Sequence, residues 1–311
     1  MAAAGGRTGS DENPAIEVVD LVKRYGDLRA VDGVSFSVRR GEFFGILGPN
    51  GAGKTTTLEM VEGLRRPDAG TIRLFGQSPW PRNAALLPRM GVQLQATAFF
   101  EKLPAREQLQ TFGALYGVSG HRIDEMLELV GLTDSAATRE DRLSGGQRQR
   151  LSIACALVHD PELVFFDEPT AALDPQARRN LWDVLREVRS RGTTIVYTTH
   201  YLDEAEELCD RVAILDGGRV LALDTPAALV RGLRSDTRVA LPAGALAEAD
   251  ARGLPGVDRV QGGEHELVMT TRSPAVLVQA LAERDRLDGV SVRTATLEDV
   301  FLQLTGREYR A

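Results

Sequence analysis

The chain has 311 residues, a length that predicts one large domain followed by a smaller one. Hydrophobic residues make up 43% and charged residues 26%, which is typical of a folded globular protein and argues against general disorder. The formal net charge of −7 argues against electrostatic binding of nucleic acid. No apolar run approaches the length of about 18 residues that indicates a transmembrane helix.

The first 13 residues are small and polar, and we expect them to form a disordered tail. They lack the apolar stretch of a secretory signal. The two cysteines, Cys155 and Cys209, lie far apart and match no metal-ligand spacing. These features together predict a reduced, cytoplasmic protein.

The first predicted elements are strands over residues 16–26, 34–38 and 43–47, where β-branched and aromatic residues are frequent. The third of these, FFGIL, is apolar throughout and predicts a fully buried strand. A glycine-rich turn follows it, and the segment TTTLEMVEGL continues as a predicted helix. Strand, glycine-rich turn and helix together are the context in which a phosphate-binding loop is expected.

That turn reads GPNGAGKTT, in which Gly48, Gly53, Lys54 and Thr55 fill the pattern G-x-x-x-x-G-K-[ST]. Glycines let successive backbone N–H groups point toward phosphates, and the helix start adds its positive dipole end. We expect Lys54 to reach the β- and γ-phosphates and the Thr55 hydroxyl to bind Mg²⁺. The same loop supplies the further candidates Asn50, Gly51 and Thr56.

Residues 100–160 are predicted to be mostly helical because their apolar residues recur at helical spacing. The first helix follows Pro104, the second ends at Gly131, and the third begins near Gly146 and stops at Pro161. The expected apolar faces are Leu109, Phe112 and Tyr116; then Ile123, Met126, Leu127 and Val130; then Leu151, Ala154, Cys155 and Val158.

A short buried strand, LVFFD, leads directly into two acidic residues. Phosphoryl transfer with a phosphate loop needs a carboxylate at the end of such a strand for the magnesium shell, and Asp167 fits. Glu168 follows it and is placed to polarise the attacking water. Asp174 then precedes Pro175 as the predicted N-cap of the next helix.

A strand over TTIVYTTH and a hairpin turning at Gly217–Gly218 complete the first domain. The elements that follow read βαββαβ and fit a small ferredoxin-like unit. Ser273 is the predicted N-cap of its second helix, and Pro274 is the predicted first residue of that helix. We therefore predict a disordered tail over 1–13, a nucleotide-binding domain over 14–233 with a helical subdomain at about 96–160, and an α+β domain over 236–311.

The segment LSGGQ at residues 143–147 heads an apolar-striped helix and forms a second candidate anion-binding helix start. With this segment the chain resembles the ATP-binding-cassette (ABC) ATPases, whose signature motif is LSGGQ. The resemblance covers residues 16–230 and keeps the order of the family's motifs. It implies a P-loop NTPase core with RecA-like, antiparallel β and helical subdomains, in an overall α/β fold.

The resemblance carries functional roles to matching positions of this sequence. Gln95 matches the glutamine that touches Mg²⁺ and the attacking water, although Gln93 lies close enough to be an alternative. His200 matches a histidine that contacts the γ-phosphate, whereas His121, His159 and His265 match no motif. The resemblance also implies that Tyr25 stacks on adenine and that Asp174 belongs to the loop that links two subunits. The positions implied for nucleotide contact are Tyr25, Ser144, Gly145, Gly146, Gln147 and Asp174.

The family implies a head-to-tail homodimer that binds two ATP molecules with Mg²⁺ and drives a separate membrane permease from the cytoplasmic face of the membrane. The ending TATLEDVFLQLTGREYR resembles the daunorubicin/doxorubicin-resistance type, whose partner is an ABC-2 exporter permease. This ending also predicts an amphipathic helix that packs on the small domain, because one face of the helix would hold Leu297, Val300, Phe301 and Leu304. The implied function is ATP-driven export of a drug, antibiotic or lipid-like substrate.

Three other functions fit less well. A single-cassette ABC ATPase with a non-transport role remains the main alternative, but translation factors of this type carry two cassettes, and repair proteins insert a long coiled coil before the signature. A GTPase is disfavoured because the chain lacks an N-K-x-D motif. A scaffold protein would not need Glu168 or His200.

Overall fold

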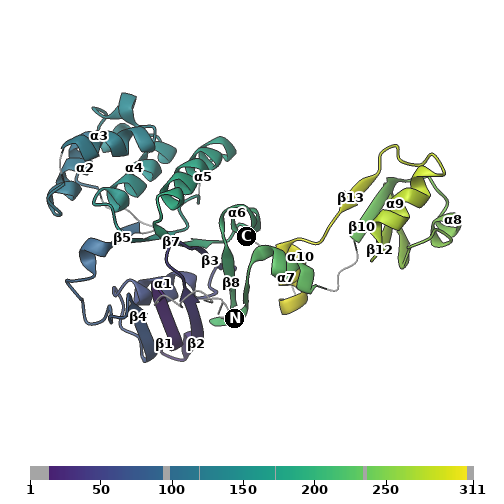
Figure 1. Ribbon diagram of the computed structural model, residues 1–311, viewed down its shortest axis with the longest axis horizontal. Coiled ribbons are helices and arrows are strands. Elements are labelled where there is room, and N and C mark those ends of the chain that lie inside the picture. Colours follow the sequence, from purple (N-terminus) through teal and green to yellow (C-terminus); the bar gives the residue numbers. More distant parts are fainter. Residues whose placement is uncertain (1–13, 94–98, 119, 172, 234–236, 307–311) are drawn as a thin grey trace, which may run out of the picture. The chain divides into compact units, whose positions relative to one another are not determined.

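The computed structural model describes residues 14–93, 99–118, 120–171, 173–233 and 237–306. Its backbone contacts divide the chain into two compact units that meet between Pro226 and Ala227 (Figure 1). The domain limits expected from the sequence, 14–233 and 236–311, remain a proposal about how the chain is organised.

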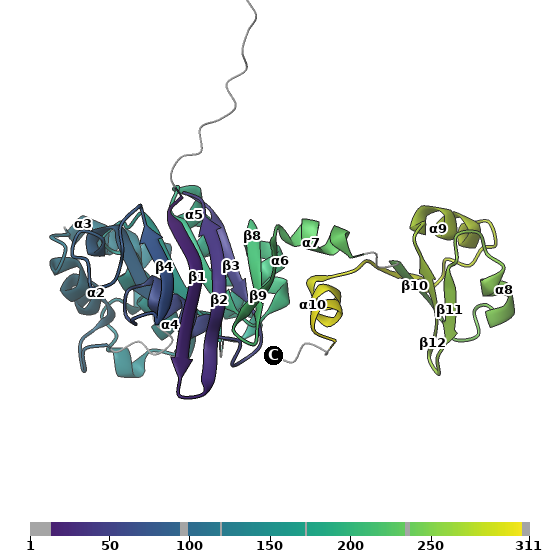
Figure 2. The same cartoon turned by 90° about the horizontal axis from the view of Figure 1, so that it is seen from below.

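The first unit begins with an antiparallel sheet in the order β2-β1-β4 (Figure 2). Its strands are β1 (Ile16–Tyr25), β2 (Leu28–Val38) and β4 (Ala69–Leu74). Strand β2 begins earlier than the predicted residue 34, because Tyr25 pairs with Leu28 across a tight hairpin. The sequence signal was weak there since Asp32 and Gly33 interrupt the alternation of apolar residues.

A mixed sheet of spatial order β5-β6-β7-β3-β8-β9 forms the centre of this unit. All neighbouring strands in it are parallel except β8 and β9, which form the predicted hairpin. Gly217 and Gly218 both have positive φ, as a type I′ turn requires. The strands are β3 (Phe43–Leu47), β5 (Met90–Gln93), β6 (Leu163–Asp167), β7 (Thr194–Thr199), β8 (Arg211–Asp216) and β9 (Arg219–Asp224).

Strands β3 and β6 are buried at every residue. Central parallel strands have both faces covered, which explains why FFGIL and LVFFD are apolar almost throughout instead of alternating. The carboxyl ends of these strands lie along one edge of the sheet, so the segments that follow β3, β6 and β7 are brought side by side.

The helices of the first unit are α1 (Lys54–Val61), α2 (Ala105–Ala114), α3 (Gly120–Leu129), α4 (Gly145–Leu157), α5 (Pro175–Ser190) and α6 (Leu202–Leu208). Helices α2, α3 and α4 contact one another and form a group apart from the antiparallel sheet (Figure 1). Most of their predicted apolar faces are buried, including Leu109, Ile123 and Leu151. Tyr116 differs, because α2 ends before it and its ring stacks on His159 at the surface.

The second unit holds the predicted βαββαβ order, preceded by a helix that begins at the junction of the two units. Its sheet has the order β11-β12-β10-β13 with antiparallel neighbours, which is the ferredoxin-like topology, so this prediction is confirmed. The elements are α7 (Pro226–Gly232), β10 (Thr237–Pro242), α8 (Glu248–Arg252), β11 (Arg259–Gly262), β12 (Glu266–Thr271), α9 (Pro274–Ala282), β13 (Ser291–Arg293) and α10 (Leu297–Thr305).

Two local expectations for this unit were wrong. Ser273 precedes α9, but its side chain does not cap the helix; instead its backbone N–H donates to the Thr271 hydroxyl. On α10, Leu297, Val300 and Phe301 are buried whereas Leu304 is 43% exposed. Leu304 lies in the last turn, near the end that Gly306 closes with positive φ.

Over the part of the chain that the structure describes, we find no helix that combines the length and the apolar character needed to cross a bilayer.

Candidate active site

The candidate site lies at the carboxyl edge of the mixed sheet. Strand β3 leads into the glycine-rich loop, β6 ends at Asp167 and leads to Glu168, and β7 leads to His200. Since β7 lies between β3 and β6, these three chain segments are neighbours in space. In α/β sheets of this kind, ligands bind outside the carboxyl ends of the strands.

The loop needs glycine at two positions for reasons of space. A Cβ on Gly48 would lie 2.3 Å from the Leu215 carbonyl oxygen, and one on Gly53 would lie 2.3 Å from that of Ala30. Gly53 also has a φ of 97° as the N-cap of α1. At the tip of the loop, Asn50 and Gly51 are exposed, and in the first turn of α1 both Thr55 and Thr56 are half-buried.

Lys54 is buried beneath this loop, and each of its three donor positions is used. Its Nζ donates to the carbonyl oxygens of Gly48 at 2.8 Å and Pro49 at 3.2 Å. It also forms an ion pair with Oε1 of Glu168 at 3.0 Å. The lysine of the loop and the glutamate predicted for catalysis are therefore in direct contact.

Asp167 and Thr55 place two oxygen ligands close together. The Thr55 hydroxyl lies 3.4 Å from Oδ1 of Asp167, to which the Thr198 hydroxyl also donates. Burial raises the pKa of Asp167, and the hydrogen bonds from Thr198 and Thr55 oppose that shift. A hydroxyl and a carboxylate are the hard oxygen donors that Mg²⁺ prefers, so these residues fit that ion.

Glu168 is held in an unusual backbone conformation with a φ of 45°. Its N–H donates to the Thr198 hydroxyl at 2.9 Å, and its Oε2 lies 3.1 Å from Nδ1 of His200. Burial would raise the pKa of Glu168, but the hydrogen bond and charge of Lys54, together with His200, outweigh it and lower the pKa. Left-handed conformations of residues other than glycine cost energy and concentrate at functional sites.

The signature segment forms the N-terminus of α4. Ser144 is the N-cap: its hydroxyl accepts from the Gln147 N–H, and the Gln147 side chain accepts from the Ser144 N–H, which is a capping box. Ser144 and Gly145 are exposed, while Gly146 is half-buried and a Cβ added to it would lie 3.5 Å from the Cβ of Ala177. The cap leaves the start of the helix open to an outside ligand.

The remaining residues predicted to belong to the site are Asp174, Tyr25 and Gln95. Asp174 caps α5 as predicted, with Oδ1 accepting from the N–H groups of Gln176 and Ala177 at 2.9 Å each. Tyr25 is 41% exposed at the end of β1, with the guanidinium of Arg65 over its ring. Gln95 lies outside the described residues.

Gln93, the alternative to Gln95, is buried at the end of β5. It pairs in register with Phe166, the residue before Asp167. The sheet therefore places Gln93 at the same edge as the acidic residues.

Sequence reasoning missed Thr198, which holds both acidic residues in place. It also missed Glu204, a fully buried carboxylate whose Oε2 accepts from Tyr197 at 2.8 Å and from Thr199 at 2.6 Å. Arg178 on α5 lies 3.6 Å from the other oxygen of Glu204. The sequence feature that could have revealed these residues is the segment YTTH, which places several hydroxyl groups at the end of a strand that is buried throughout. Buried hydroxyl groups need hydrogen-bond partners.

Comparison with known proteins shows to which family the chain belongs. A sequence model of the ABC transporter family matches residues 31–171. The Nod factor export ATP-binding protein I of Ralstonia nicotianae is 41% identical, over 97% of each chain. The linearmycin resistance ATP-binding protein of Bacillus subtilis is 36% identical, over 95% of this chain and 99% of its own.

Solved structures show the same fold. The ATP-binding subunit of an ABC transporter is 32% identical with a TM-score of 0.65, over 71% of this chain and 94% of that one. A cassette in a dimeric post-hydrolysis state with ADP and Pi bound is 26% identical with a TM-score of 0.61, over 68% of this chain and 98% of that one. The protein therefore belongs to the ATP-binding subunits of the ABC transporter family, and it is an ATPase.

Proposed function

We propose that this chain is the motor subunit of an ABC-2 type exporter, in which two copies bind ATP between them and drive a separate membrane permease. The observation that supports this most is the convergence of Lys54, Thr55, Asp167, Glu168 and His200 at one sheet edge. The relative named for Nod factor export supports an export role, and the relative named for linearmycin resistance supports an antibiotic as one class of substrate. Both relatives match nearly the full chain.

In this proposal the loop from Gly48 to Thr56 binds the phosphates through its N–H groups, and Tyr25 stacks on the adenine. Thr55 and Asp167, with Gln95, would hold Mg²⁺, which would supply positive charge that neutralises the phosphates. Lys54 turns from Glu168 toward the phosphates. This exchange is favourable because the phosphates offer the ammonium more negative charge than one carboxylate does.

Glu168, once released from Lys54, accepts a proton from the attacking water. While Lys54 contacts it, the lowered pKa keeps Glu168 ionised. When Lys54 turns away, the carboxylate loses that stabilising partner and becomes a better proton acceptor. His200 holds the second carboxylate oxygen, which limits the rotation of the Glu168 side chain. Thr198 fixes the backbone of Glu168 and the carboxylate of Asp167 together.

We place the second half of each site on the partner copy. Ser144, Gly145 and Gly146 begin an exposed helix start that suits the γ-phosphate of the partner's ATP. Asp174 follows in the loop between the copies. The dimeric solved relative with ADP and Pi supports this arrangement. Closing and opening of the dimer then shifts the permease between its states.

The test is to co-express the chain with a candidate permease of about six predicted membrane spans encoded in the adjoining gene. We expect the chain to co-purify with the permease and to lie at the cytoplasmic face of the membrane. Inverted vesicles that contain both proteins should take up substrate only when ATP is present. The Glu168→Gln variant should co-purify without transport. Binding to ribosomes or DNA, with no association with the permease, would favour the non-transport alternative.

A further inference from the structure

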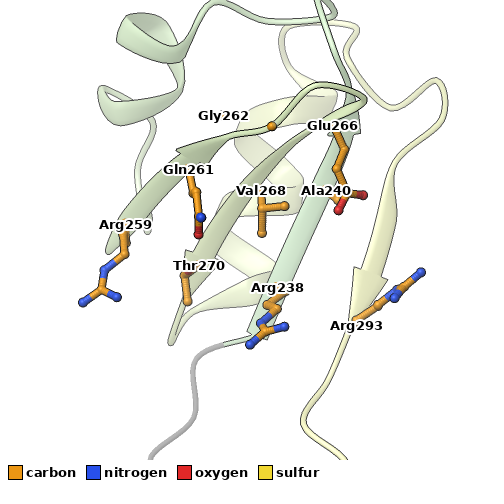
Figure 3. Close-up of a pocket in the computed structure, with 10 residues that line it drawn as sticks. Arg238, Ala240, Arg259, Gln261, Gly262, Glu266, Val268, Thr270 and Arg293 are labelled. Carbon is orange, nitrogen blue, oxygen red and sulfur yellow. The ribbon is translucent and has the colours of Figure 1, made fainter. Parts of the chain in front are cut away.

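The sheet of the second unit has one covered face and one open face. On the covered face, Val239, Leu241, Leu267 and Met269 are buried in an apolar cluster with Leu277 and Leu281 of α9. Strand side chains alternate between faces, so the residues between them point the other way. There they line a hollow of about 450 Å³ (Figure 3).

Arginines gather at one end of this hollow. In register across the sheet, Arg259 of β11 pairs with Thr270 of β12, Thr270 pairs with Arg238 of β10, and Arg238 pairs with Arg293 of β13. Four residues thus form one transverse row with a spacing of about 5 Å between strands. Figure 3 shows Arg259 and Arg238 on either side of Thr270, with Arg293 on the adjacent edge strand.

Such a row is electrostatically unfavourable by itself. Like charges directly opposite each other on neighbouring strands destabilise a sheet. Among the residues that the structure describes, none of these three guanidinium groups forms an ion pair. In the same unit, by contrast, Arg272 pairs with Asp258 and Arg252 pairs with Glu248. The positive charges of this row therefore favour binding of an anion from outside the unit.

The rest of the hollow indicates the size and kind of that partner. The next row along the strands contains Gln261, Val268 and Ala240. Val268 and Ala240 form an apolar floor beside the arginines, and Gln261 adds a polar amide next to it. Glu266 lies at the end of the hollow away from the arginines. Its carboxylate repels anions, so the acidic groups of a ligand are favoured only at the arginine end. The volume is in the range of small-molecule sites. The residues that line it include no aromatic ring, which disfavours the base stacking typical of RNA-binding sheets.

We propose that this face is a binding site for a small organic anion that carries two or more phosphate or carboxylate groups. Arg238 and Arg259 each bind one acidic group, with the Thr270 hydroxyl between them and Arg293 adding charge at the edge. The apolar or sugar-like body of the ligand lies on Ala240 and Val268. Such a site gives the ATPase a ligand-binding function separate from its nucleotide site.

The test uses the full chain and isothermal titration calorimetry with fructose 1,6-bisphosphate and citrate as probes. Fructose 6-phosphate, with one acidic group, is the matched comparison. The variants are Arg238→Gln and Arg259→Gln, with Arg252→Gln as a control that removes the same charge from the helical side of the unit. Lys54→Ala reports any binding of the probes to the phosphate loop.

We expect saturable binding of at least one probe with two or more acidic groups, and roughly tenfold or more weaker binding of fructose 6-phosphate. Each row variant should weaken binding roughly tenfold or more, since a charge-assisted hydrogen bond is lost. Arg252→Gln and Lys54→Ala should bind as the unmodified chain does. Without probe, Arg238→Gln should melt no lower than the unmodified chain, because it relieves repulsion with Arg293.

Equal affinities for Arg238→Gln and Arg252→Gln would overturn the proposal, as would the absence of saturable binding by every probe. Loss of binding in Lys54→Ala alone would place the probe in the nucleotide site and contradict it. Vesicles of phosphatidylglycerol and phosphatidylcholine form a further arm. Binding to these vesicles that depends on Arg238, without binding of the free anions, would assign the row to lipid headgroups instead.

Discussion

The ammonium group of Lys54 and the carboxylate of Glu168 form an ion pair of 3.0 Å between Nζ and Oε1, in which both side chains are nearly buried. The other two donors of the ammonium are used by the Gly48 and Pro49 carbonyls. A lysine ammonium has only three donors, so Lys54 cannot bind a phosphate without giving up one of these contacts. Nucleotide binding and release of Glu168 are thus linked through one side chain.

Replacing Glu168 with glutamine should therefore affect binding and turnover in opposite directions. The amide competes less strongly for Lys54, so we expect ATP affinity to be retained or to rise, by up to roughly tenfold. Turnover should fall at least about a hundredfold, since the proton acceptor is lost. Calorimetry with ATP and steady-state phosphate release measure the two effects.

Glu162→Gln is the matched control, because Glu162 directly precedes the same strand at its other end and pairs with Arg89 at the surface. Its affinity and turnover should match those of the unmodified chain. A Glu168→Gln variant with near-normal turnover would show that Glu168 is not the base.

Thr198 offers a test of positioning. Valine at this position leaves the Glu168 N–H and the Asp167 carboxylate without their shared hydroxyl. An unsatisfied buried group costs about 1–3 kcal/mol, and we expect that loss of stability together with turnover lowered by roughly tenfold. Thr198→Ser keeps the hydroxyl and should restore both quantities. Chemical denaturation and phosphate release are the measurements, and normal turnover in Thr198→Val would contradict the positioning role.

Ser144 has two roles that substitution can separate. Alanine removes the helix cap and should cost the monomer about 1 kcal/mol of stability. Aspartate keeps the cap, because it also accepts from the Gln147 N–H, but it repels a phosphate. In a Glu168→Gln background, light scattering should therefore show little ATP-dependent dimer for Ser144→Asp despite normal stability. Dimerisation as strong as that of the parent would exclude phosphate contact at this helix start.

The stability of the folded chain should depend on pH because of the buried carboxyl group of Glu62. Burial, with the charges of Asp167 and Glu59, raises the pKa of Glu62 from 4.5 to about 8. Its Oε1 has no hydrogen-bond partner among the described residues. The folded state therefore keeps a proton that the unfolded state loses above about pH 4.5, so stability falls as pH rises from that value to about 8.

Glutamine at position 62 has no proton to keep. The stability of Glu62→Gln relative to the unmodified chain should rise by roughly 3–5 kcal/mol between pH 5 and 8, as urea denaturation can measure. Glu17→Gln, at an exposed position of β1, is the control and should show no such trend. Parallel pH profiles for Glu62→Gln and the unmodified chain would contradict the shifted pKa.

The sequence predicts the parts of the site that depend on local pattern. The glycine loop, the acidic pair after a buried strand and the capped helix after LSG are each contained in a short segment, and parallel strands bring such segments to one edge. The contact of Lys54 with Glu168, by contrast, joins residues more than a hundred positions apart. Side-chain distances of that kind follow from packing, which no local pattern encodes.

The same reason explains the other differences. Thr198 is one of several hydroxyl residues in its strand, and only the neighbouring strand selects it as the partner of Asp167. Ser273 occupies the N-cap position of α9, but its hydroxyl forms no cap hydrogen bond, while its backbone N–H donates to the Thr271 hydroxyl. Leu304 belongs to an apolar stripe on the helix, yet it lies in the last turn and stays exposed.

The central claim is that each hydrolysis site needs two copies of the chain, the phosphate loop of one and the Ser144 helix start of the other. The most direct measurement mixes Lys54→Ala with Ser144→Asp, each expected to be inactive alone. In a mixed dimer, one site combines the intact loop of the second variant with the intact helix start of the first. We predict that the mixture regains a clear fraction of the normal ATP turnover; a mixture no more active than either variant alone would contradict the account.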